Sequence, residues 1–154
     1  MTRLRIALVL ALFFSPFPCS AGEITPEGAQ HLKTIMNDFI GFQKKMLEAN
    51  GLTKIEYEGD VTVEPAGDYY AVTLPYTKIV YTDGGHFDIG MISINASPHD
   101  VPGQWKMRVA MPTPMLMKDA SGKEVLRLAL GAQTAGGLWD ETLQNFFKLD
   151  AHYT

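Results

Sequence analysis

The chain has 154 residues, a formal net charge of −4 at pH 7 and a single cysteine, Cys19. This acidic balance argues against nucleic acid as a partner and leaves no basic patch for anionic lipid headgroups. The length is enough for one domain with a substantial core, so we expect a single domain.

The first residues predict a secretory signal peptide. Residues 1–5 are basic, and residues 6–14 form an apolar run that is too short to span a bilayer. The small residue Ala21 places the expected cleavage directly after it, so residues 1–21 would be removed on export. A lipoprotein signal acylated at Cys19 and an uncleaved anchor are the alternatives, although Pro18 stands where a lipoprotein signal has a small residue.

Export has consequences for the remaining chain, residues 22–154. Removal of Arg3, Arg5 and Cys19 changes the formal charge from −4 to −6 and leaves no cysteine. The mature domain therefore has neither a disulfide nor a thiol nucleophile, and its core alone must hold it together.

An amphipathic helix is expected at the start of this domain. Thr25 is a good N-cap, Pro26 is tolerated at the first helical position, and Glu27 suits the positive end of the helix dipole. Asn50-Gly51 is a typical helix end. The apolar stripe consists of Leu32, Ile35, Met36, Phe39, Phe42, Met46 and Leu47. We expect this stripe to pack on a sheet; a mobile lid or a membrane-surface helix is the alternative, but the excess of Lys and Arg typical of the latter is absent.

The apolar period changes from 3.6 to 2 after Thr53, which indicates strands, with a break at Gly59. The apolar parity reverses near Gly90 and predicts a β-bulge there, because an extra residue moves the following side chains to the other face. A bulge bends a sheet. We therefore expect the helix to pack on a curved antiparallel sheet, which makes the fold class α+β.

The strand region contains an offset copy of itself. A shift of 37 residues places residues 70–75 on residues 107–112, with proline at the end of both segments, and Gly85 on Gly122. Each unit has the order strand, proline step, strand, glycine turn, strand, and this order predicts repeated hairpins.

The last third of the chain has three further features. Residues 95–103 are expected to form the longest loop, and the strand that follows is interrupted by Pro112-Thr113-Pro114. Gly136-Gly137 is expected to open a final segment, either a short helix or another strand. The strand pattern near residues 148–153 either closes the sheet or belongs to a longer repeating β protein, and we favour the second reading.

The sequence contains no motif of a known catalytic site, so we expect no enzyme activity, no catalytic residue and no cofactor. The pairs His86/Asp88 and His99/Asp100 lack a third ligand at a spacing typical of zinc, and no metal site is expected. Four methionines, namely Met107, Met111, Met115 and Met117, share one parity. They suit a Cu(I) site, a surface for an apolar ligand, or a plain core, of which the core is favoured.

Several short pieces of the mature chain carry a resemblance. They are Leu74-Pro75, Met111-Pro112-Thr113-Pro114, Gly131-Ala132-Gln133 and Gly137-Leu138-Trp139. With the signal peptide and the early helix, they resemble uncharacterised periplasmic β-rich proteins of proteobacteria. More loosely, the architecture is similar to envelope carriers of the LolA and AsmA-like type, whose curved antiparallel sheets shelter acyl chains. The resemblance implies a periplasmic location and supplies no catalytic residue.

Together these features predict a periplasmic binding module of the cell envelope that holds a lipid or another apolar small molecule. The residues expected to line the ligand groove are Tyr70, Val72, Trp105, Met107, Val109 and Met111, with Phe39 and Phe42 as the closing face. Their role would be to desolvate an acyl chain. The alternative is a structural or interaction domain that pairs with a protein partner through a free sheet edge.

Overall fold

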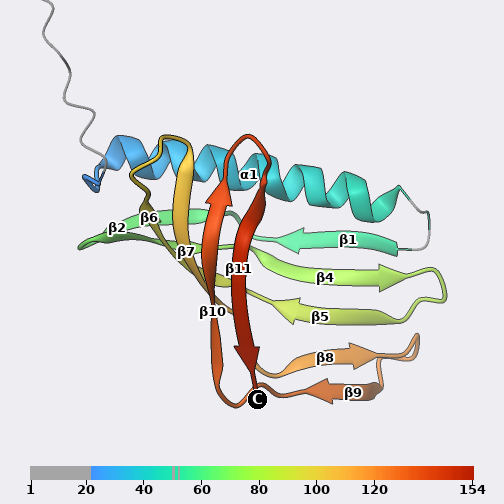
Figure 1. Ribbon diagram of the computed structural model, residues 1–154. Helices are drawn as coiled ribbons and strands as arrows, with labels where there is room; N and C mark the ends of the chain where they lie inside the picture. Colours follow the sequence, from blue (N-terminus) through green and yellow to red (C-terminus); the bar gives the residue numbers. More distant parts are fainter. Residues whose placement is uncertain (1–21, 50, 52) are drawn as a thin grey trace, which may run out of the picture.

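The computed structural model describes residues 22–49, 51 and 53–154. Over these residues the fold is α+β, with one helix and eleven strands in two antiparallel sheets (Figure 1). The expected signal peptide, residues 1–21 with Cys19, lies outside the described residues.

Helix α1 (Pro26–Glu48) begins where the sequence predicts. The hydroxyl of Thr25 accepts a hydrogen bond from the backbone N–H of Gly28 at 3.0 Å, and Pro26 is the first helical residue. Ala29, Leu32 and Met36 are buried along one side of the helix. No helix in the described part of the chain has the length and apolar character needed to span a membrane.

The strands form two open sheets, A and B. Sheet A has the strand order β1-β4-β5-β8-β9. Its strands are β1 (Thr53–Glu58), β4 (Tyr76–Tyr81), β5 (His86–Gly90), β8 (Met115–Lys118) and β9 (Glu124–Leu128). Sheet B has the order β11-β10-β7-β6-β3-β2. Its strands are β2 (Thr62–Ala66), β3 (Tyr69–Thr73), β6 (Ser93–Pro98), β7 (Gln104–Ala110), β10 (Gln133–Asp140) and β11 (Asn145–Tyr153).

The chain crosses between the sheets after β1 and then after each hairpin. Hairpin β2-β3 belongs to sheet B, β4-β5 to sheet A, β6-β7 to sheet B, β8-β9 to sheet A and β10-β11 to sheet B. The sequence led us to expect one curved sheet, and the structure divides it into two. A proline such as Pro75 or Pro112 lacks the N–H that would continue a ladder, which lets the strand end and the next one start elsewhere.

The bulge predicted near Gly90 is confirmed. Thr77 lies opposite Gly90 and Lys78 lies opposite Asp88, so Ile89 is the extra residue of β5. Gly90 has a φ of +94°, a left-handed conformation that favours glycine. The bulge falls at the end of β5, directly before the chain leaves sheet A for sheet B.

Two expectations for the later part of the chain were wrong in detail. The expected loop over residues 95–103 is shorter, because β6 continues to Pro98. Gly136-Gly137 lies inside β10 and does not open a new segment. A Cβ atom at Gly137 would overlap the carbonyl oxygen of Lys148, so the glycines permit a close approach of the neighbouring strands.

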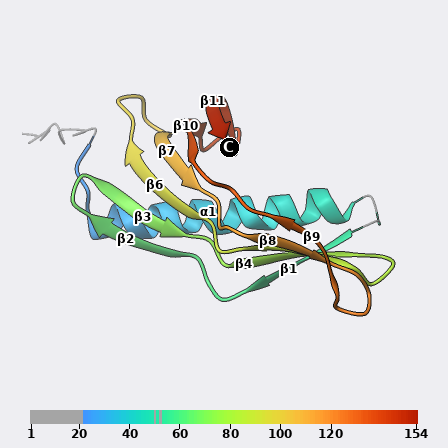
Figure 2. The same cartoon turned by 90° about the horizontal axis from the view of Figure 1, so that it is seen from below.

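Most of the core lies between α1 and sheet B. Figures 1 and 2 show the first half of α1 against sheet B and its second half alongside sheet A. The core cluster contains Ala29, Leu32, Ile35, Met36, Val61, Tyr70, Val72, Leu74, Ile94, Ala96, Trp105, Met107 and Trp139. Sheet A contributes none of these side chains from its strands.

Candidate functional site

Four residues of the predicted ligand groove form part of the core. Tyr70, Val72, Trp105 and Met107 are between 1% and 6% exposed and pack against the apolar stripe of α1. Val109 and Phe39 are partly buried and pack against the same cluster. The face that the sequence assigns to a ligand is therefore filled by the helix.

The contacts inside this cluster are those of a packed interior. The rings of Tyr70 and Trp105 lie edge to face with centroids 6.0 Å apart, and Phe39 meets Trp139 in the same way at 6.3 Å. The hydroxyl of Tyr70 accepts a hydrogen bond from the backbone N–H of Thr25 at 2.9 Å. These contacts fix the start of α1 on sheet B.

The other two predicted groove residues are not brought into this cluster. Phe42 lies further along α1 and is 45% exposed. Met111 follows β7, where its backbone N–H donates to Oε1 of Gln133 and its carbonyl accepts from Nε2, both at 2.8 Å. The closing face that we expected Phe39 and Phe42 to form together is thus split between core and surface.

The outer face of sheet B, away from α1, carries two shallow polar hollows with volumes of about 670 and 530 Å³. Both are lined by Asn95, Arg108 and Gly136, and the larger also by Asp150. Their charged and hydrogen-bonding side chains, among them Arg108 and Asn95, suit a small polar molecule better than an acyl chain.

A third hollow of about 400 Å³ lies beside the start of α1. There Oε1 of Glu141 accepts a hydrogen bond from the indole N–H of Trp105 at 2.7 Å and lies 3.2 Å from Nε2 of His31. The described residues that line this hollow include no serine, threonine or cysteine, so the histidine and carboxylate have no side-chain nucleophile to activate.

A charged cluster lies on one face of sheet A. The side chain of Asp88 is 8% exposed, and its Oδ2 accepts a hydrogen bond from Nζ of Lys118 at 2.7 Å. Burial disfavours the charged carboxylate, but the hydrogen bond and charge of Lys118 outweigh it. With smaller contributions from His86 and Tyr76, they lower the pKa of Asp88 below its ordinary value.

This cluster also accounts for the His86/Asp88 pair noted in the sequence. Nε2 of His86 lies 3.7 Å from Oδ2 of Asp88, while the ammonium group of Lys118 takes the position that a cation would need. At the other pair, Nδ1 of His99 accepts a hydrogen bond from the N–H of Val101. No group of three or more potential His, Cys, Asp or Glu ligands is found within the part of the chain that the structure describes.

The four methionines are divided between the sheets. Met107 faces the core of sheet B, whereas Met115 and Met117 belong to β8 of sheet A. The proline step at Pro112 separates them, so the shared parity of the sequence does not become one row of thioethers.

Sheet A presents a second apolar face, which the sequence analysis did not assign to a ligand. Residues that are directly paired on neighbouring strands have their side chains on the same face of a sheet. Successive pairs in sheet A therefore define a row with one side chain from each strand. This row is Ile55, Ile79, Phe87, Met117 and Leu126, from β1 to β9. The neighbouring pair of Met115 and Leu128 carries further apolar atoms.

The exposure of this row changes from one edge of sheet A to the other. Among the described helices and strands outside sheet A, only α1 makes an extensive contact with the sheet, and it does so at β1. Ile55 is accordingly 4% exposed, Ile79, Phe87 and Met117 are half-buried, and Leu126 is 52% exposed. The row thus becomes more accessible toward β9.

The opposite face of sheet A is charged. Lys118 pairs with His86 and Glu124 across the strands, and Lys78 pairs with Glu56 and Asp88. The alternation of polar and apolar residues in β5, His86-Phe87-Asp88-Ile89, is the signal in the sequence for a strand with one charged and one apolar face. It does not show that this strand belongs to a second sheet, where the apolar face is separate from the core under α1.

Comparison of the chain with protein-family models, with curated proteins and with solved structures found no match. The function therefore has to be argued from the geometry of these surfaces.

Proposed function

We propose that this chain is an exported binding module of the cell envelope that holds the acyl chain of a lipid on the apolar face of sheet A. One observation carries the proposal: the row from Ile55 to Leu126 crosses all five strands, and its side chains become more exposed from β1, at 4%, to β9, at 52%. Soluble domains seldom leave a continuous apolar surface of this kind without a binding role.

The dimensions and chemistry of the face suit a long aliphatic chain. Four inter-strand spacings of about 4.8 Å give the row a length of roughly 19 Å. A chain laid along it would meet Ile79, Phe87 and Met117 in succession, with few polar groups to leave unpaired. Burial of apolar surface contributes about 25 cal/mol of binding free energy per Å². Contact along the whole row would therefore stabilise the bound acyl chain without polar contacts.

The proposed repeat of hairpins would widen sheet A in equal steps. The shift of 37 residues relates β4-β5 to β8-β9, and each hairpin adds two strands to sheet A. A duplicated unit that ends each time in such a hairpin widens sheet A by two strands, while the shift places Ile79 on Leu116 and Phe87 on Glu124, so the apolar row itself is not copied residue by residue. Repetition thus supplies a simple way to fit the sheet to a long ligand.

Export fits the same proposal. With residues 1–21 removed as a signal peptide, the domain would reach the periplasm, where lipids must pass between membranes through water. We propose a carrier or holding role and no enzyme activity, because the ionisable side chains nearest sheet A are paired with one another on its opposite face.

The proposal is tested by gentle purification of the protein from its host, extraction, and mass spectrometry for lipid. A fluorescent fatty acid bound to the delipidated protein measures the affinity. Met117→Lys, which places a charge in the row, should weaken fatty-acid binding at least tenfold. Leu116→Lys on the same strand is the matched control, because the side chain of residue 116 lies on the charged face. Fatty-acid binding by this variant should equal that of the wild type.

The result that would overturn the proposal is equally concrete. It would be the absence of any co-purifying lipid together with failure to bind the fluorescent fatty acid. Equal effects of Met117→Lys and Leu116→Lys would also exclude this face as the site.

A further inference from the structure

We infer that β11 pairs with β11 of a second copy of this chain, antiparallel and centred on Leu149, so that two molecules share one continuous sheet. This interaction surface is separate from the acyl-chain face of sheet A and goes beyond the proposed binding function. It rests on the backbone of β11, on the accessibility of its side chains and on the order of its charges.

The backbone of β11 has one free side. Its only extensive contact within the described chain is with β10. At its end, the N–H of Thr154 donates to the carbonyl of Ala132 at 3.1 Å, and the carbonyl of Thr154 accepts from Gly131 at 2.7 Å. Backbone groups in an antiparallel ladder alternate in direction, so those of Lys148, Asp150 and His152 point to β10, and those of Leu149, Ala151 and Tyr153 point outward.

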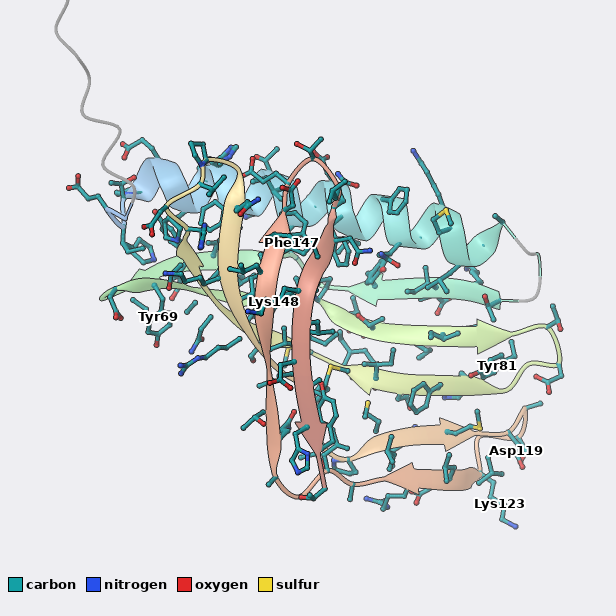
Figure 3. All side chains as sticks on the ribbon, in the orientation of Figure 1. Tyr69, Tyr81, Asp119, Lys123, Phe147 and Lys148 are labelled. Carbon is teal, nitrogen blue, oxygen red and sulfur yellow. The ribbon has the colours of Figure 1, made fainter. Side chains whose placement is uncertain are left out.

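This edge lacks proline and a covering element, two features that commonly prevent strand pairing. β11 spans nine residues, contains neither proline nor glycine, and carries Phe147 at 48% and Leu149 at 56% exposure. Figure 3 shows Phe147 and Lys148 on this strand. The other edge of sheet B, β2, is protected by Pro65 and by packing of α1. β11 has neither of these protections; it carries Lys148 and a bulge at Phe147, so pairing with another strand would run over the regular part after the bulge.

The charges select both the partner and the register. When β11 meets an identical antiparallel strand with Leu149 opposite Leu149, Lys148 of each copy lies opposite Asp150 of the other. Registers centred on Phe147 or on Ala151, whose backbone groups also point outward, place Lys148 opposite Phe146 or Thr154 and form no Lys–Asp pair. The short stretch Lys148-Leu149-Asp150 is thus complementary to itself under a two-fold axis.

The backbone pattern agrees with the same centre. Leu149 has its N–H and carbonyl directed outward, so two copies of it can exchange both hydrogen bonds. Lys148 and Asp150 then form the non-hydrogen-bonded pairs, in which side chains approach more closely. Phe147 and Ala151 face each other across the axis, which removes exposed apolar surface from water in both copies.

Charge reversal tests this register directly. The wild-type protein should sediment as a dimer at a concentration of about 0.1 mM, at which a dimer with a micromolar dissociation constant is well populated. Lys148→Asp and Asp150→Lys should each weaken self-association at least tenfold. A mixture of these two variants should form a heterodimer, because each Asp of one then lies opposite a Lys of the other. The circular dichroism spectra of both variants should match that of the wild type, because the substituted side chains lie on the surface and the fold should be unchanged.

Cross-linking supplies a readout of position. In the protein without Cys19, Leu149→Cys should form a disulfide-linked dimer on mild oxidation, since Cα atoms of a hydrogen-bonded pair lie about 5.5 Å apart, within disulfide range. Val125→Cys is the matched control, because Val125 lies on edge strand β9 and has the same 56% exposure. A monomeric wild type, cross-linking at Val125 alone, or failure of the mixed variants to associate would overturn the inference.

Discussion

Gly137 lies where β10 and β11 approach too closely for a side chain. A Cβ at this position would overlap the carbonyl oxygen of Lys148. Gly137→Ala should therefore lower the free energy of unfolding by about 1–3 kcal/mol, as forced overpacking commonly does. Urea denaturation measures the change. Gly41→Ala in α1, whose Cβ would meet no atom within 4 Å, is the control and should raise stability by about 0.5–1 kcal/mol. Equal effects of the two changes would contradict the steric argument.

Asp88 should make the stability of the protein depend on acid pH. Despite the opposing effect of burial, Lys118 lowers the pKa of Asp88 in the folded state. The stabilisation is therefore complete above the unfolded pKa of about 4 and is lost as the pH falls through the lower folded value. Wild type should be more stable than Asp88→Asn at pH 7, and the difference should shrink below about pH 4. Urea unfolding at several pH values checks this; a difference that grows on acidification would refute it.

At the scale of elements, α1 protects the first edge of sheet A. Nζ of Lys44 donates to the carbonyl of Ile55 at 2.9 Å, and Oε1 of Glu48 accepts from the N–H of the same residue at 3.2 Å. The ion pair of Lys44 and Glu48, 3.0 Å apart, thus replaces the strand that would otherwise satisfy the outward backbone of β1. The helix serves as a cap on sheet A as well as a core element on sheet B.

Loss of this cap should expose β1 to pairing. Glu48→Ala leaves the N–H of Ile55 without its partner and should lower the midpoint of thermal unfolding and increase aggregation on heating. Lys54→Ala, which breaks the solvated pair of Lys54 and Glu56 on the same strand, is the control and should have little effect. Differential scanning fluorimetry with light scattering measures both properties. A larger effect from Lys54→Ala would refute the capping role.

Local features of these elements could be predicted because they depend on neighbouring residues. The start of α1 follows from Thr25-Pro26, and the bulge in β5 follows from the change of parity at Gly90. The division into two sheets could not be predicted in the same way, since strand pairing joins residues far apart in sequence. Pro75 marks an end of a strand but carries no information about which sheet the next strand joins.

The same limit explains the candidate site. Alternation correctly placed Trp105 and Met107 on one face of a strand. It could not tell whether that face meets a ligand or a helix, because burial by α1 and burial by an acyl chain require the same residue types. Met117 was noted only as a methionine, since its neighbours Phe87 and Leu126 come from other strands.

At the scale of the whole molecule, the packed core and the proposed binding face lie in different sheets. Sheet B has α1 on one face and contains the large buried side chains, including Trp139 and Tyr70. Sheet A extends away from the helix beyond β1 (Figures 1 and 2). Its strand pairing places charged residues on one face and apolar residues on the other. A layer without a packed partner opens at low free-energy cost, and such regions commonly bind ligands.

This division predicts unequal costs for two similar substitutions. Met107→Ala removes a side chain that is 3% exposed in the core of sheet B and should cost about 2–5 kcal/mol of stability. Met117→Ala removes a half-buried side chain from sheet A and should cost about 1 kcal/mol or less. Urea denaturation of the ligand-free protein measures both changes.

In hydrogen exchange, amides of β5 and β8 should exchange faster than those of β6 and β7, and bound fatty acid should slow the exchange of β5 and β8 alone. Equal costs for the two methionines would mean that sheet A is as firmly packed as sheet B, and an acyl chain would then have no free face to occupy.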